Sequence, residues 1–169
     1  MDHRTLHLID LENLAGGGAL SFEPALSAAN AYRHHVPVGP GDLVTVATGP
    51  SSSLAANQAF PTARLLIGRG VDGADRALLQ VLTDDPAIRR VDQVVVASGD
   101  GIFAAPVRDL TRTAVYVAIA CRLSALSTRL RLAASMLIAL PEPDEAERVT
   151  RNVAGNGRRG RAGHPATRP

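Results

Sequence analysis

Leu6-His-Leu-Ile-Asp-Leu-Glu-Asn-Leu14 is the stretch that best indicates the fold of this chain. Its apolar residues predict a strand over residues 5–10, followed by a loop that carries Asp10, Glu12 and Asn13. In an open α/β sheet, ligands bind at the carboxyl ends of the strands. The stretch therefore predicts a first strand that delivers polar groups to a functional edge.

The rest of the chain alternates between strand and helix patterns. Further strands are expected over residues 42–48, 64–68, 91–97, 114–120 and 136–140. Helices are expected over residues 24–35, 72–83 and 103–110, and after residue 127. This alternation predicts a single α/β domain over residues 1–140, with a doubly wound, mainly parallel sheet of five to six strands.

Composition separates this domain from the last residues. Residues 1–140 hold 12 Arg and 12 acids, whereas residues 152–169 hold 4 Arg and no acid. We expect residues 141–169 to form a disordered tail rich in Arg, Gly and Pro. Either Arg158, Arg159 and Arg161 contact phosphates there, or the tail is an inert solvated terminus. The single cysteine, Cys121, argues against an intrachain disulfide and a cysteine-based zinc site.

No targeting signal is evident in the sequence. The first residues lack a signal-peptide pattern, and no apolar run is long enough to span a membrane. We therefore expect a cytoplasmic protein without a membrane partner, and a homodimer is left open as its assembly.

Acidic residues follow three of the predicted strands. Asp10 follows the first, Asp72 and Asp75 follow the third, and Asp100 follows the fourth. If these strands are neighbours, the carboxylates meet at one edge, where they either share protons or bind a cation. Carboxylate oxygens suit Mg²⁺ or Mn²⁺, which activate water and stabilise charge on a phosphoryl group.

Several of the polar candidates also have structural interpretations. Asp72 suits a helix N-cap, and Glu12 is expected to be solvated or to lie behind the metal ligands. Asn13 could hold its loop or contact substrate. Arg69, close to the second acidic loop, could bind phosphate or remain solvated.

Together these stretches resemble the NYN domain, a family of the PIN-like nuclease superfamily. The resemblance rests on Leu8-Ile-Asp-Leu-Glu-Asn-Leu14, Gly73-Ala-Asp-Arg-Ala-Leu78, Val94-Val-Val-Ala-Ser-Gly-Asp-Gly-Ile-Phe103 and Leu126-Ser-Thr-Arg-Leu130. It implies a Rossmann-like fold and a ribonuclease that uses Mg²⁺ or Mn²⁺ to cleave RNA, with single-stranded RNA as the expected partner. By motif position it implies Asp10, Asp75 and Asp100 as catalytic metal ligands, and Asn13 and Ser98 as substrate-binding or loop-positioning residues.

Two positions depart from the family pattern. Ile102 stands where the family often has a second acid, and Asp72 stands where it often has lysine. Asp72 is therefore retained as a further candidate ligand. The alternative hypothesis is a catalytically weak or inactive module of the same fold that binds nucleic acid or has a regulatory role. A third is a phosphatase-like or nucleotide-binding α/β domain that shares only the acidic strand ends.

Overall fold

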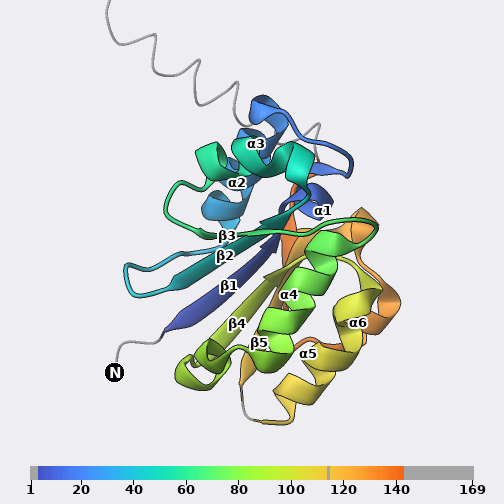
Figure 1. Cartoon of the computed structure of the whole chain (residues 1–169). Helices are drawn as coiled ribbons and strands as arrows, with labels where there is room; N and C mark the ends of the chain where they lie inside the picture. The colour runs from blue at the N-terminus through green and yellow to red at the C-terminus, as the bar shows by residue number, and fades with distance from the viewer. Residues whose placement is uncertain (1–3, 114, 143–169) are drawn as a thin grey trace, which may run out of the picture.

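The computed structural model describes residues 4–113 and 115–142 of the chain. Within these residues, six strands form one all-parallel sheet in the order β3-β2-β1-β4-β5-β6 (Figure 1). The strands are β1 (Thr5–Asp10), β2 (Leu43–Thr48), β3 (Arg64–Ile67), β4 (Gln93–Ala97), β5 (Tyr116–Arg122) and β6 (Met136–Leu140). The predicted parallel α/β sheet is therefore confirmed, and its strand order is that of a Rossmann-like fold.

Helices cover both faces of the sheet. The α-helices are α1 (Leu11–Ala15), α2 (Phe22–His35), α3 (Ser53–Ala59), α4 (Gly73–Asp84), α5 (Ala104–Thr111) and α6 (Thr128–Ala133). Four short 3₁₀ helices join them, namely η1 (Pro50–Ser52), η2 (Pro86–Arg90), η3 (Gly101–Phe103) and η4 (Leu123–Ala125). α1, α2 and α3 lie on one face, and α4, α5 and α6 lie on the other (Figure 1).

The alternation of side chains along each strand builds two hydrophobic cores. In β1, Leu6 and Leu8 point to the core under α4, α5 and α6, whereas Ile9 points to the core under α1, α2 and α3. β4 lies beside β1 in the register Leu8↔Val96, so Val94 and Val96 share the face of Leu6 and Leu8. Cys121 of β5 is buried in this second core, as expected for a free cysteine.

The structure corrects some of the expected boundaries. α2 begins at Phe22, two residues before the proline expected to start it, because Ser21 takes the N-cap position. The loop expected after β1 is instead the five-residue helix α1, with Asp10 as its N-cap. The predicted tail from residue 143 onward, with Arg158, Arg159 and Arg161, lies outside the described residues. None of the helices within residues 4–113 and 115–142 is long and apolar enough to cross a membrane.

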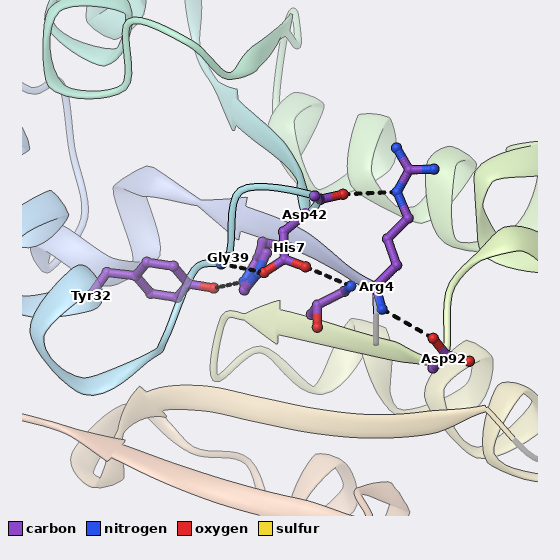
Figure 2. A network of polar contacts seen from close by, with 8 residues as sticks. Arg4, His7, Tyr32, Gly39, Asp42 and Asp92 are labelled. Atoms are coloured by element: carbon purple, nitrogen blue, oxygen red, sulfur yellow. Dashed lines mark hydrogen bonds and ion pairs between the residues drawn. The ribbon is translucent and has the colours of Figure 1, made fainter. Parts of the chain in front are cut away.

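A polar network ties the amino ends of the strands together (Figure 2). The buried His7 ring lies between the Tyr32 hydroxyl, 2.7 Å from Nδ1, and Asp42 Oδ2, 3.3 Å from Nε2. Asp42 also accepts hydrogen bonds from the backbone N–H groups of Thr5 and Gly39. The network therefore joins β1 to α2 and to the turn before β2, at the end of the sheet away from the acidic loops.

The protonation of this network follows from burial. Burial lowers the pKa of His7, although the hydrogen bond and the charge of Asp42 oppose that shift. Burial also raises the pKa of Tyr32. A neutral His7 ring therefore accepts from the Tyr32 hydroxyl at Nδ1 and donates from Nε2 to Asp42.

Candidate functional site

Asp10 reaches the candidate site because it continues the inward alternation of β1. It lies on the same face as Leu6 and Leu8, two residues beyond the latter, and only 4% of it is exposed. Its Oδ1 accepts a hydrogen bond from Asn13 N at 3.2 Å, which caps α1. One carboxylate oxygen thus holds the helix that follows the strand.

Ser98 and Asn13 lock the loop after β4 onto β1. The buried Ser98 hydroxyl donates to Asp10 Oδ2 at 3.1 Å and accepts from Asp100 N at 3.2 Å. Asn13 Oδ1 accepts from Gly99 N at 3.1 Å. Both predicted residues therefore position the acidic loops in this structure, and Ser98 has no surface exposed to a substrate.

Asp75 reaches Asp10 by a different route from the one expected. The sequence predicted that the carboxylates meet if their strands are neighbours, but β2 separates β3 from β1. Instead, α4 crosses back over the sheet and contacts β1, β2 and β3. Asp75, in the first turn of α4, comes into side-chain hydrogen-bonding contact with Asp10.

This contact between two acids shifts the pKa of both. Burial raises the pKa of Asp10 to about 7; the charge of Asp75 adds to the rise, and the hydrogen bonds from Asn13 and Ser98 oppose it. Burial also raises the pKa of Asp75; the hydrogen bond with Asp10 opposes that rise, and the charges of Asp100, Asp72 and Glu12 add to it. Asp75 therefore lies within a cluster of acids, and its pair with Asp10 retains a proton near neutral pH.

Asp100 and Asp72 act on Asp75 through their charge and do not join the contact. Asp100 Oδ1 accepts from Ile102 N at 2.9 Å and so caps η3. Asp72 is exposed at the N-cap position of α4 in a left-handed conformation (φ 53°), and its side chain makes no capping hydrogen bond. Within residues 4–113 and 115–142, no three His, Cys, Asp or Glu side chains form a ready-made metal-binding group.

Glu12 and Arg122 support the site from behind. Glu12 Oε1 accepts from Thr48 Oγ1 (3.3 Å), Gly49 N (3.0 Å) and Ser52 Oγ (2.9 Å), which ties α1 to the end of β2. Arg122 Nη2 donates to the carbonyl of Asn13 at 2.8 Å. The sequence pointed to Glu12 as a residue behind the ligands, but it carried no signal for Arg122, which lies 109 positions from its partner.

Arg69 stays apart from this arrangement. It is exposed in the turn between β3 and α4, and it makes no hydrogen bond or ion pair with any described residue. The structure thus brings together Asp10, Asp75, Ser98 and Asn13, places Asp100 beside them, and leaves Arg69 at the rim.

The centre of the site offers oxygen donors of the kind that hard divalent cations prefer. Two carboxyl groups in contact repel each other unless a proton or a cation lies between them. Asp10 offers oxygens that are already fixed by Asn13 and Ser98, and oxygen ligands are those that Mg²⁺ and Mn²⁺ prefer. A cation would therefore replace the shared proton of Asp10 and Asp75.

Comparisons with known proteins support the fold of the chain. No family model matches the chain, and no curated protein matches it. Its fold is similar to the crystal structure of a protein of unknown function from Vibrio parahaemolyticus, with a TM-score of 0.61 and 16% sequence identity. The match covers 85% of this chain and 97% of that one, so the two share nearly the whole α/β architecture.

Proposed function

We propose that this chain is a ribonuclease of the NYN kind that depends on a divalent metal ion. The observation that supports the proposal is the contact between the Asp10 and Asp75 carboxyl groups, with Asp100 close enough to raise the pKa of Asp75. Perturbed acids that converge at the carboxyl edge of a parallel sheet favour a functional site over a structural one. The choice of RNA rests on the resemblance of the four sequence motifs to the NYN domain.

Some residues of the site would bind the metal ion, and others keep those ligands in position. Asp10 and Asp75 would hold Mg²⁺ or Mn²⁺, with Asp100 as the third candidate ligand and Asp72 at the rim. The ion, when bound, would offset the charge that develops on the phosphoryl group. Ser98, Asn13 and Glu12 keep the acids in place through their hydrogen bonds.

The test is cleavage of single-stranded RNA by the purified chain in Mn²⁺. We expect Asp100→Asn and Asp75→Asn to lower the cleavage rate at least about 100-fold, the scale seen when one preorganised electrostatic group is removed. Asp84→Asn is the matched control, because Asp84 is an exposed acid at the end of α4, outside the site. Equal RNA loss with all four proteins, or none with any, would refute the nuclease proposal.

A second candidate is an inactive nucleic-acid-binding module of the same fold. One observation favours it: Ile102 stands where the family often has an acid. RNA binding that persists in Asp75→Asn, without cleavage by the unaltered chain, would favour this candidate. Cleavage of a small phosphomonoester without RNA cleavage would instead favour the phosphatase-like hypothesis.

A further inference from the structure

We infer that the groove between α5 and α6 binds one nucleotide of the RNA strand beside the phosphate to be cleaved, with Arg108 and Arg129 on its phosphate and Ile102 and Leu132 against its base and sugar. This inference rests on the proposed function and adds a binding site to it. Its starting point is a groove of about 690 Å³ next to the acidic cluster, with Asp100 in its lining. This volume lies within the usual range for sites that hold small organic ligands.

Two arginines supply the positive charge of the groove. Arg108 comes from α5 and Arg129 from the first turn of α6, and both are exposed. Arg129 makes no hydrogen bond or ion pair with the part of the chain that the structure describes, and Arg108 has only a 3.8 Å ion pair with the exposed Asp109. Both guanidinium groups are therefore available to an anion, and their planar forks suit phosphate.

The position of Arg129 relates the groove to the acidic loop. Its Nη2 lies 3.6 Å from where a Cβ on Gly101 would stand, so the guanidinium lies over the residue that follows Asp100. A backbone hydrogen bond holds the start of α6 against the loop after β4, since Ser127 N donates to the Gly99 carbonyl at 2.9 Å. A phosphate held by Arg129 would therefore lie next to the carboxylate cluster, as the neighbouring phosphate of a bound strand must.

The remaining lining of the groove suits a flat, partly apolar group. Ile102 is 40% exposed and Leu132 is 77% exposed, and both line the groove. Ala104, Ala105 and Ala133 leave room between them. Guanidinium groups beside apolar side chains match a nucleotide, which joins an anion to a ring with an apolar face. Ile102 would then offer an apolar contact to the RNA strand at a position where an acid would repel it.

The experiment titrates the full chain with adenosine 5′-monophosphate in EDTA and follows amide shifts by NMR. We expect shifts in η3 and α6, and an approximately tenfold weaker affinity in both Arg108→Gln and Arg129→Gln, the size expected for one charge-assisted hydrogen bond. Arg112→Gln and Arg131→Gln are the matched controls, because these exposed arginines lie on the same two helical segments but outside the groove. We expect their affinities to stay within about twofold of the unaltered chain.

Inorganic phosphate as a second probe separates a nucleotide site from a bare anion site. Ile102→Ala and Leu132→Ala should weaken the binding of the nucleotide and leave that of phosphate unchanged. Equal effects on both probes, no saturable shifts in the groove, or equal effects of Arg129→Gln and Arg131→Gln would overturn the inference.

Failure of the inference and failure of the proposed function can be told apart. The titration contains no metal ion and involves no cleavage, so it reports on the groove alone. If the chain cleaves RNA with Mn²⁺ and the double variant R108Q/R129Q leaves the KM for RNA unchanged, nucleotide binding in the groove is refuted. The proposed nuclease function then stands. If groove binding is found but RNA is not cleaved, the nucleotide site stands and its placement beside a cleaved phosphate is refuted.

Discussion

At the residue scale, the surroundings of Asp10 have opposing effects on the protonation of its carboxyl group. Its oxygens accept hydrogen bonds from Asn13 N and Ser98 Oγ, which favour the ionised form, whereas burial and Asp75 favour the protonated form. Burial prevails and raises the pKa of Asp10 to about 7, so the folded protein retains a proton that the unfolded chain releases near pH 4.

The first prediction concerns the stability of the metal-free protein. Between about pH 4 and pH 7 the folded state binds more protons than the unfolded state, so stability should fall as pH rises, by at most about 1.4 kcal/mol per pH unit for one proton. Asp75→Asn removes one acid of the pair and should flatten this slope. Urea unfolding in EDTA at pH 5 and pH 7 measures it, and an identical slope in Asp75→Asn would contradict the coupling of the two acids.

The second prediction concerns His7, whose titration should change stability with pH in the opposite direction to that of Asp10. Because burial lowers the pKa of His7, the unfolded chain takes up a proton below about pH 6.5 before the folded protein does. The contribution of His7 to stability should therefore be lost as pH falls from about 6.5 through the folded pKa. His7→Gln, compared with the unaltered chain by thermal unfolding at pH 7.5 and pH 5.5, should show a smaller loss on acidification. Replacement of the exposed His34, which lies outside this network, is the control.

At the element scale, the turn between β3 and α4 decides where Asp75 lies. The backbones of Gly68 and Gly73 are so close that a Cβ on Gly68 would stand 2.0 Å from the Gly73 carbonyl carbon. The same turn holds Asp72 in its left-handed conformation. This close approach fixes the start of α4 over β1 and β2, and so aims Asp75 at Asp10.

The third prediction follows from that approach. Gly68→Ala should push α4 away from β3, with a cost of about 1–3 kcal/mol in stability and weaker binding of Mn²⁺. Gly41→Ala is the matched control, because a Cβ there meets nothing within 4 Å, and its effect should stay within about 0.5 kcal/mol. Chemical unfolding and Mn²⁺ titration measure the two effects. Equal stability of the two variants would show that the turn tolerates a side chain.

The elements also show how far the sequence could predict the site. Apolar patterning predicted β1, α4 and β6 to within a residue, because clustered apolar residues mark the two strands and helical spacing of apolar residues marks α4. It missed α1, since five residues are too few to show a helical period. It predicted that Asp10, Asp75 and Asp100 meet if their strands are neighbours. It did not predict that a helix crossing the sheet brings Asp75 close, nor that Arg122 supports Asn13, because both depend on contacts between distant segments.

At the scale of the whole molecule, charge is divided unevenly along the chain. Residues 1–140 are balanced, with 12 Arg and 12 acids, whereas residues 152–169 carry 4 Arg without an acid. The acidic cluster itself repels a phosphate backbone. If the chain binds RNA as proposed, attraction over a distance would come from local arginine groups and from the last segment of the sequence.

The fourth prediction tests that last segment. Deletion of residues 152–169 should weaken RNA binding and lower the slope of log affinity against log salt by roughly 0.7 for each phosphate of a single strand that the segment neutralises. Fluorescence anisotropy with labelled oligouridylate, at salt concentrations of roughly 50–200 mM, measures the slope. A variant in which Arg158, Arg159 and Arg161 are all replaced by Gln should reproduce the deletion. An unchanged slope would show that the segment takes no part in binding.

The pairing of β1 with β4 determines how much of the chain must be made before this part of the sheet can fold. Asp10 and Ser98 are 88 positions apart, and their hydrogen bond exists only once both strands lie side by side. During synthesis, β1 must therefore wait for β4 to leave the ribosome, and contacts this distant in sequence form slowly. At least the first 98 of the 169 residues must therefore be made before Ser98 can hold Asp10 in place.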